Sequence, residues 1–374
     1  RTLIDSRMVE NNRVEYKEGW NPEAILHSIC AFANDYDNVY GGYIVLGVKD
    51  DNGMPSKDSP GIPAEDVDRI NKDLLNLVNR IEPKYEVDSS YEEYNGIGMF
   101  IIWAPGGHDR PYKCPIGIGK KDKGMGFYIR KQSSTVRANP SQEKNLFRIS
   151  DSIMFDDRPN YTASIEDLDL GLIREYLANI GSRKSLEQVP KKTLEEICFD
   201  LRIVTGPTEF RKPLNVGLLF FTPKPSEFIR CAYVEVVTFP DVTGSSMISK
   251  RFDGPLDQQI KGCVAYIESS IIQKRTDKVP SKVESKSFYN YPLEALEEVI
   301  VNAVLHKDYM IPEPVTVHIY NDRIEVMNIP GPLDSIPDSE VRNGTMRSTS
   351  YRNRRIGDFL ERLDLAEVKN SGML

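Results

Sequence analysis

The sequence predicts an α+β protein made of two domains. Its 374 residues exceed the ~100–200 residues that one core usually organises. Apolar residues recur with helical spacing in some segments and with strand spacing in others, in both halves of the chain. A run of polar and turn-forming residues at 156–160 interrupts this pattern. We therefore expect a linker there, a mixed α/β domain at residues 1–155 and a second α/β domain at residues 160–374.

The elements of the first domain follow from apolar spacing and from the residues that end helices and strands. Apolar spacing predicts helices at residues 22–33 and 64–80, and strands at residues 43–48, 97–103 and 126–130. Asn21 can cap the first helix, and Pro22 suits its first turn. Gly41 and Gly42 then introduce the first strand, which favours a tight turn, with close approach to a ligand as the alternative.

The second domain is expected to have two parts, at residues 160–285 and 286–374. The earlier part should contain two helices within residues 167–204, strands at 214–222 and 230–239, and a helix at 256–273. The later part should contain a helix at 292–306 and strands at 314–320 and 323–327. Pro292 suits the start of that helix, and Asn321-Asp322 between the two strands predicts a hairpin.

Composition places the chain among folded, soluble proteins. Hydrophobic residues make up 40% and charged residues 28% of it, which lies outside the low-hydrophobicity range of disorder. No run approaches the ~18 apolar residues of a membrane span, and residues 1–20 lack the apolar core of a signal peptide. We expect a cytoplasmic protein with no membrane association, although the chain opens on Arg1 and an earlier segment could precede it. The five cysteines form no CxxC pair and the four histidines are dispersed, which disfavours a structural zinc site.

Charge is distributed unevenly along the chain. The formal net charge is −8, but residues 107–148 contain ten Lys or Arg against three Asp or Glu, which is +7 locally and −15 elsewhere. Such local basicity suits a phosphate-binding surface, and the alternative is a solvated loop whose charge is balanced elsewhere. Within this segment Arg130, Lys131 and Arg137 alternate with hydroxyl residues, so they are the expected phosphate contacts.

Carboxylates in the first domain are candidate metal ligands. Glu10 and Glu15 precede Lys17, and Asp50 ends the predicted strand at 43–48. If these three carboxylates converged, they would offer the oxygen ligands with which Mg²⁺ or Mn²⁺ activates water against a phosphodiester. By spacing alone, a solvated face is the alternative.

The first domain resembles the Schlafen/AlbA-like family. The resemblance covers most of residues 8–140 and rests on Glu15-Tyr16-Lys17, on the segments 31–34 and 41–53, and on residues 128–138. It implies a nucleic-acid-binding domain that uses Lys17 with the basic residues above. In nuclease members it implies catalysis and metal binding by Glu10, Glu15 and Asp50, with Asp51 competing for the last role. The alternative is that these acids orient Lys17 and cap the turn.

The later part of the second domain resembles RecG-related, GHKL-like ATPase domains, which form an α/β sandwich. The resemblance rests on residues 294–309, 323–331, 352–353 and 370–372. It implies that Glu298 activates water, that Asn302 holds Mg²⁺, and that Asn328 and Gly331 contact ATP. The i, i+4 spacing puts Glu298 and Asn302 on one helix face. Asn328 stands where the family has Asp, and Pro332 stands where it has Gly, so we expect at most nucleotide binding without efficient hydrolysis.

Arginines are frequent near the end of the chain. They are Arg342, Arg347, Arg352, Arg354 and Arg355. We expect a solvated helix face here, with a second phosphate-binding edge as the alternative.

The sequence supports one leading function and two alternatives. We expect a nucleic-acid-binding protein, such as a bacterial-type transcriptional regulator, that binds DNA or RNA and carries a degenerate nucleotide site. The alternatives are a Schlafen-like metal-dependent nuclease and a GHKL-type ATPase. A homo-oligomer is also expected, because such assemblies are common.

Overall fold

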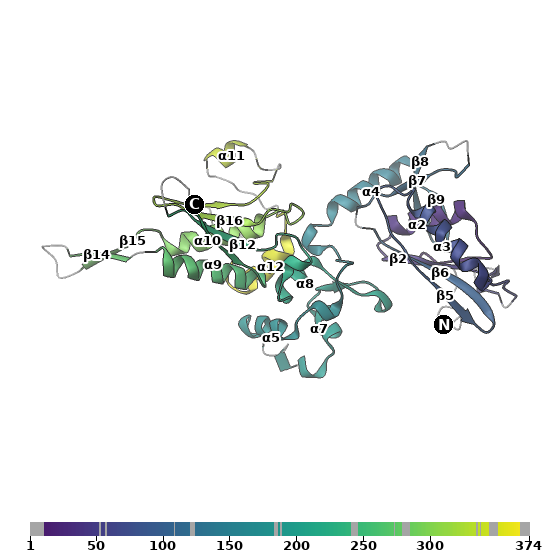
Figure 1. Ribbon diagram of the computed structural model, residues 1–374, viewed down its shortest axis with the longest axis horizontal. Coiled ribbons are helices and arrows are strands. Elements are labelled where there is room, and N and C mark those ends of the chain that lie inside the picture. Colours follow the sequence, from purple (N-terminus) through teal and green to yellow (C-terminus); the bar gives the residue numbers. More distant parts are fainter. Residues whose placement is uncertain are drawn as a thin grey trace. The chain divides into compact units, whose positions relative to one another are not determined.

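The computed structural model divides into two compact units, Arg1–Ile153 (unit 1) and Met154–Leu374 (unit 2). It describes residues 11–51, 54–56, 58–107, 109–119, 124–182, 186–187, 189–240, 246–272, 274–278, 285–333, 336, 338–343 and 351–366. The predicted α+β architecture with two mixed units is confirmed (Figure 1). None of the helices in these ranges is long and apolar enough to cross a membrane.

Unit 1 contains a four-stranded sheet. Its order is β1 (Val14–Lys17), β2 (Gly41–Leu46), β6 (Ile97–Pro105) and β5 (Asp88–Tyr94). Strand β1 runs parallel to β2, and the other neighbours are antiparallel. The short strands β3 (Asp50–Asp51) and β4 (Met54–Pro55) pair with each other beyond the end of β2.

A second sheet and three helices complete unit 1. The sheet contains β7 (Lys113–Pro115), β8 (Met125–Lys131) and β9 (Ser134–Arg137), all antiparallel. The helices are α2 (Pro22–Asn34), α3 (Val67–Val78, after the 3₁₀ turn Ala64–Asp66) and α4 (Pro140–Ser152). Helix α2 contacts β2 and β6 on one side and β7, β8 and β9 on another, so it is the central element of this unit.

The start and end of α2 have local causes. Asn21 caps the helix as predicted, since its Oδ1 accepts from Ala24 N at 3.2 Å. The helix ends at Asp35, whose carboxylate accepts from Val39 N at 2.7 Å and from Tyr40 N at 3.1 Å.

The glycine pair after this turn allows close packing within unit 1. A Cβ on Gly42 would lie 2.2 Å from the Phe32 ring, and Gly41 has a φ of +84° with Ala104 O 2.1 Å from its would-be Cβ. The close approach that the glycines permit is therefore to the protein's own helix and strand.

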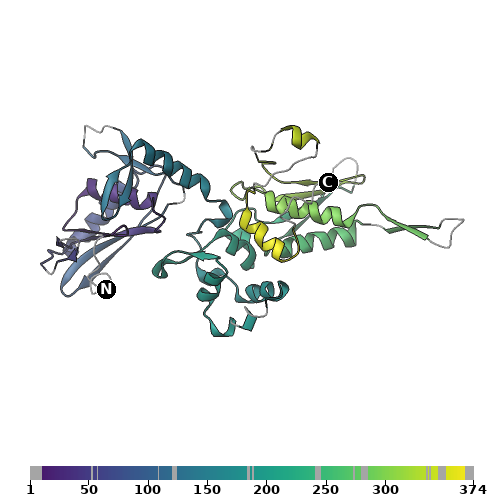
Figure 2. The same ribbon diagram turned by 180° about the vertical axis from the view of Figure 1, so that it is seen from behind.

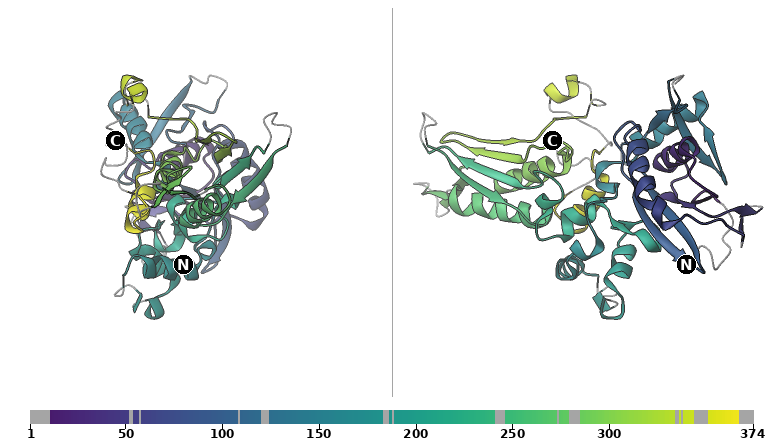
Figure 3. Two further views of the ribbon diagram at one scale, coloured as in Figure 1. Left: turned by 90° about the vertical axis from the view of Figure 1, so that its left-hand side faces the viewer. Right: turned by 45° about the vertical axis from the view of Figure 1, so that its right-hand side comes forward.

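Unit 2 is built around a two-layer α/β sandwich. Its sheet has the order β13 (Ile248–Phe252), β12 (Val234–Thr238), β16 (Val315–Ile319) and β17 (Ile324–Met327). Strands β12 and β16 are parallel, and the other pairs are antiparallel. Helices α9 (Leu256–Ser270) and α10 (Leu293–His306) pack against each other and against these strands (Figure 2). Figure 3 shows this helix layer beside the sheet, and the hairpin predicted around Asn321-Asp322 joins β16 to β17.

The remaining elements of unit 2 are short. The helices are α5 (Leu170–Asn179), α7 (Leu194–Asp200), α8 (Asn215–Phe221), α11 (Asp338–Asn343) and α12 (Arg354–Arg362). The 3₁₀ turns are η2 (Phe155–Asp157), η3 (Ile165–Asp167), η4 (Val189–Lys191), η5 (Thr208–Phe210) and η6 (Pro225–Glu227). The strand pairs are β10 (Val204–Thr205) with β11 (Lys212–Pro213), and β14 (Lys274–Lys278) with β15 (Ser285–Tyr289). One hydrophobic core extends from Ala163 to Leu360.

Two sequence predictions for unit 2 were wrong. Residues 214–222 were expected to form a strand, but they contain α8, in which every residue is buried. A short apolar run that is buried on all sides shows no periodicity that separates a strand from a helix. The stretch at 156–160 was expected to be a linker, but Asp156 is fully buried and Pro159 forms a β-bridge with Leu214. This stretch belongs to the core of unit 2.

Candidate nucleic-acid interface

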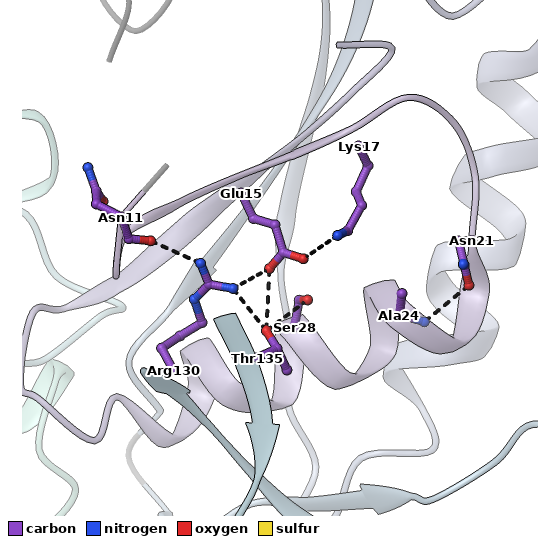
Figure 4. A network of polar contacts seen from close by, with 8 residues as sticks. All are labelled: Asn11, Glu15, Lys17, Asn21, Ala24, Ser28, Arg130 and Thr135. Carbon is purple, nitrogen blue, oxygen red and sulfur yellow. Dashed lines mark hydrogen bonds and ion pairs between the residues drawn. The ribbon is translucent and has the colours of Figure 1, made fainter. Parts of the chain in front are cut away.

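Glu15 is the centre of a polar network in unit 1 (Figure 4). It lies on β1 opposite Ile44 of β2, and only 5% of its surface is exposed. Its Oε2 accepts from Arg130 Nη1 at 2.5 Å, and its Oε1 lies 2.6 Å from Lys17 Nζ. Thr135 Oγ1 donates to the same Oε2 at 3.4 Å. Both carboxylate oxygens of Glu15 are therefore occupied by donors from the protein itself.

Arg130 extends this network to three further groups. Its Nη2 donates to the main-chain oxygen of Asn11 at 2.9 Å, and its Nη1 donates to Thr135 Oγ1 at 2.9 Å. The guanidinium lies over the Phe32 ring, 5.0 Å from its centroid. Only 4% of Arg130 is exposed. The predicted phosphate contact Arg130 is thus a buried structural residue that joins β8 to β1 and α2.

Ser28 links α2 to the network. Its Oγ lies 3.1 Å from Thr135 Oγ1, and 1% of the residue is exposed. The network therefore draws on β1, α2, β8 and β9, which are far apart in the sequence. Sequence reasoning missed Ser28, although a single hydroxyl within the apolar helix 22–33 is a detectable signal, because a buried hydroxyl needs a partner.

The hollow beside Arg130 is small. It is lined by residues that include Asn12, Asp35 and Tyr36, and it offers about 10 Å³. That volume suits about one water molecule. It is too small for a nucleotide.

The remaining predicted basic residues lie on different faces of the β8–β9 hairpin. Arg137 pairs with Tyr128 on the face that carries Arg130 and points toward α2, whereas Lys131 pairs with Ser134 on the opposite face. Lys131 and Arg137 are exposed, and neither forms an ion pair with another described residue. Lys17 has a side-chain exposure of 31% but its amino group is bound to Glu15. The hairpin thus presents one cation on each face.

His27 and Tyr128 form a stacked pair beside Arg137. Their ring centroids are 3.9 Å apart, and His27 Nε2 lies 3.0 Å from the carbonyl oxygen of Pro115. Burial lowers the pKa of His27 and raises the pKa of Tyr128 to about 12. Both rings are therefore uncharged at neutral pH, and the hairpin's α2 face contributes charge through Arg137.

The proposed metal triad is not assembled within the described residues. Glu10 lies outside them, and Asp50 and Asp51 are exposed on β3, beyond the end of the strand that pairs with Glu15's strand. In the described part of the chain no group of three His, Cys, Asp or Glu side chains could hold a metal ion. Glu15, whose oxygens are held by Arg130 and Lys17, does not fit a metal ligand in this arrangement. Metal binding by Glu10, Glu15 and Asp50 stays a prediction.

The predicted nucleotide-site residues occupy two regions of unit 2. Glu298 is exposed and Asn302 half-buried on α10, while Asn328 and Gly331 follow β17. The two regions meet at the end of α10, where Asp308 N donates to Ile329 O at 3.1 Å. Nucleotide binding by these four residues also stays a prediction.

The arginines near the end of the chain are partly structural, which corrects the expectation of a solvated face. Arg352 donates to the main-chain oxygens of His306 and Gly331, the latter at 3.2 Å. Arg355 donates to Asp157 Oδ1 at 2.8 Å. Arg342 and Arg354 are exposed, and Arg347 lies outside the described residues. Two of the five side chains therefore hold α10, η2 and α12 together.

Comparison with known protein families agrees with both resemblances. Residues 10–139 match the family "Schlafen, AlbA_2", and residues 313–374 match the family "Putative ATP-dependent DNA helicase recG C-terminal". Unit 1 is therefore a Schlafen AlbA_2 domain. The chain as a whole joins this domain to a RecG-related, ATPase-type C-terminal region.

Two solved structures are similar to the chain. The crystal structure of the DIP2311 protein from Corynebacterium diphtheriae is 18% identical, with a TM-score of 0.42, and the match covers 96% of this chain and 69% of that one. The solution structure of the N-terminal domain of a RecG-related protein from Nitrosomonas europaea is 25% identical, with a TM-score of 0.26. That match covers 37% of this chain and 91% of the other. No curated protein matches the chain.

Proposed function

We propose that unit 1 binds nucleic acid through the phosphate backbone, and that the chain acts as a nucleic-acid-associated regulator of the bacterial type. The observation that carries this proposal is the buried ion pair between Glu15 and Arg130, which holds the β8–β9 hairpin against β1. The hairpin presents Lys131 and Arg137 to solvent. The Schlafen AlbA_2 family and the RecG-related family that the C-terminal region matches support the same class of ligand.

The physical basis of binding is the exposure of the two cations. Lys131 and Arg137 form no ion pair with another described residue, so both charges are available to phosphate oxygens. Ser133 and Ser134, exposed at the hairpin turn between them, can donate to the same oxygens. Contacts of this kind give affinity without reading the base sequence. The affinity should therefore fall steeply with salt.

We infer binding in preference to cleavage from the state of Glu15. A carboxylate that already accepts from Arg130, Lys17 and Thr135 would have to lose these partners before it could hold Mg²⁺ or Mn²⁺. Breaking a buried ion pair costs several kcal/mol. The nuclease hypothesis therefore requires a rearrangement, whereas phosphate binding does not.

The first experiment measures binding of labelled transfer RNA, single-stranded DNA and duplex DNA by fluorescence anisotropy over a salt series. The Lys131→Ala/Arg137→Ala variant should bind more weakly, and the slope of log K against log salt should fall by about 0.7–0.9 for each phosphate that the variant no longer binds. Lys84→Ala removes an equal charge from an exposed ion pair elsewhere in unit 1 and should leave the slope unchanged.

Three outcomes separate the hypotheses. Salt-sensitive binding that weakens in the double variant supports the proposal. Absence of binding to all three probes overturns it. Cutting of any probe that needs Mn²⁺, stops with EDTA and disappears in Glu10→Ala/Glu15→Ala would replace it with the nuclease alternative.

A further inference from the structure

Helix α4 carries an exposed stripe that is separate from the hairpin cations. Lys144, Phe147 and Arg148 stand at positions i, i+3 and i+4, so their side chains share one face of the helix. All three are exposed, and Phe147 has 49% of its surface in solvent. A phenylalanine this exposed between two cations is unusual on a soluble domain, because an apolar ring in water gains nothing for folding.

The rest of α4 explains why the stripe faces outward. Leu146, beside the stripe, is buried in a cluster with Ile129 of β8 and Ala138. The ring of Phe147 meets Phe127 of β8 edge to face, with centroids 5.8 Å apart and an interplanar angle of 75°. This contact fixes the orientation of the Phe147 ring while leaving half of the residue exposed. The α4 stripe is thus a preorganised aromatic surface.

One hairpin cation lies on the same side as the stripe. Residues alternate between the faces of β8, so Phe127, Ile129 and Lys131 share the face that α4 covers. Neither Lys144 nor Arg148 forms an ion pair with another described residue. The α4 stripe and Lys131 therefore combine an exposed ring with three available positive charges, which is complementary to a polyanion that has accessible flat groups.

We propose that the α4 stripe binds a single-stranded segment of nucleic acid, with one base stacked on Phe147 and the flanking phosphates on Lys144 and Arg148. Single strands expose the faces of their bases, whereas the bases of a duplex are already stacked on each other. This inference rests on the proposed function and names its substrate class. It assigns selectivity for single strands to α4 and general phosphate affinity to the β8–β9 hairpin.

The test uses the full chain and two fluorescein-labelled probes, an oligothymidylate and a DNA duplex of equal length. Phe147→Ala should weaken binding of the single strand by roughly 5- to 150-fold, which corresponds to the loss of one stacked base. Binding of the duplex should change by less than about twofold. Phe147→Trp preserves a stacking ring and should retain single-strand affinity. Leu75→Ala, which shortens another exposed apolar side chain on a helix of unit 1, should change neither.

The outcomes also separate this inference from the proposed function. Unchanged single-strand binding in Phe147→Ala, or an equal loss for both probes that Phe147→Trp does not restore, would overturn the role of the α4 stripe and leave the hairpin contacts standing. If the unmodified chain binds neither probe, both proposals fail. If Phe147→Ala instead converts an oligomer to a monomer in sedimentation velocity, the stripe is an interface between copies of the chain and the inference is wrong.

Discussion

The two units each bury a carboxylate, and they accommodate it in opposite ways. Glu15 in unit 1 is 5% exposed and lies within 2.6 Å of cationic groups from both Arg130 and Lys17. Asp156 in unit 2 is fully buried, and its Oδ2 accepts from the main-chain N–H of Ile356 at 3.0 Å. Its Oδ1 has no hydrogen-bond partner in the described structure. The nearby guanidinium of Arg355 binds Asp157 instead.

This difference shows two solutions to the cost of burying a charge. In unit 1 the cost is offset by pairing, because two cations and a hydroxyl replace the water around Glu15. In unit 2 it is reduced by protonation, because burial raises the pKa of Asp156 to about 6. Asp156 still caps α12 through Ile356, which both protonation states can do. Unit 1 thus depends on a charge that unit 2 partly avoids.

The largest expected effect comes from breaking the pair in unit 1. Glu15→Ala leaves Arg130 buried without its counter-charge, which should lower the free energy of unfolding of unit 1 by about 3–5 kcal/mol. Both tryptophans, Trp20 and Trp103, lie in unit 1. Tryptophan fluorescence during urea unfolding of the full chain therefore reports this unit separately.

Two variants decide whether charge is the cause. Glu18→Ala, which removes an exposed carboxylate close by, should change the stability of unit 1 by no more than about 0.5 kcal/mol. Glu15→Met/Arg130→Met removes both charges and should cost less than Glu15→Ala alone. A double variant that is as unstable as the single variant would show that shape and hydrogen bonding, and not the unpaired charge, determine the loss.

The second expected effect tests protonation in unit 2. A carboxyl whose folded pKa is about 6, against an ordinary value of 3.8, binds its proton more tightly in the folded state. Unit 2 should therefore lose stability as pH rises from about 4 to 6, by up to about 3 kcal/mol at 1.36 kcal/mol per pKa unit. Asp156→Asn should remove this loss, so the variant should be the more stable protein at pH 7.5 but not at pH 4.

The measurement is urea unfolding at several pH values, followed by far-UV circular dichroism through the transition that leaves tryptophan fluorescence unchanged. Asp322→Asn removes a carboxylate with 76% side-chain exposure from the same unit and controls for net charge. A stability difference between Asp156→Asn and the unmodified chain that is constant from pH 4 to 7.5 would contradict the shifted pKa of Asp156.

The sequence predicted the local features of unit 1 well. Helix α2, its cap Asn21 and strand β2 were all expected, because caps and apolar spacing act over a few residues. The resemblance also selected Glu15 and Arg130 as site residues. It did not predict that they bind each other, since 115 residues separate them and no periodicity reports a contact at that range.

Unit 2 shows the complementary failure. Its sandwich follows from strand and helix patterns, but Asp156 was assigned to a linker because polar residues in a turn-rich stretch usually meet solvent. Here the polar group is buried against the N-terminus of α12, two hundred residues later in the chain. Arg352 was misjudged for the same reason, as its acceptors are main-chain oxygens of α10 and the loop after β17. A backbone acceptor carries no side-chain signature in the sequence.

The smallest expected effect separates the ion pair of unit 1 from the hydroxyls that extend it. Ser28→Ala removes one hydroxyl from Thr135 Oγ1, which keeps its contacts with Arg130 and Glu15, so unit 1 should lose only about 1 kcal/mol. Tryptophan fluorescence in urea measures this loss, and Ser133→Ala at the exposed hairpin turn should change stability by no more than about 0.5 kcal/mol. If Ser28→Ala costs as much as Glu15→Ala, the hydroxyl chain between α2 and β9 holds the site together, and the contrast between a paired and a protonated carboxylate no longer explains the stability of unit 1.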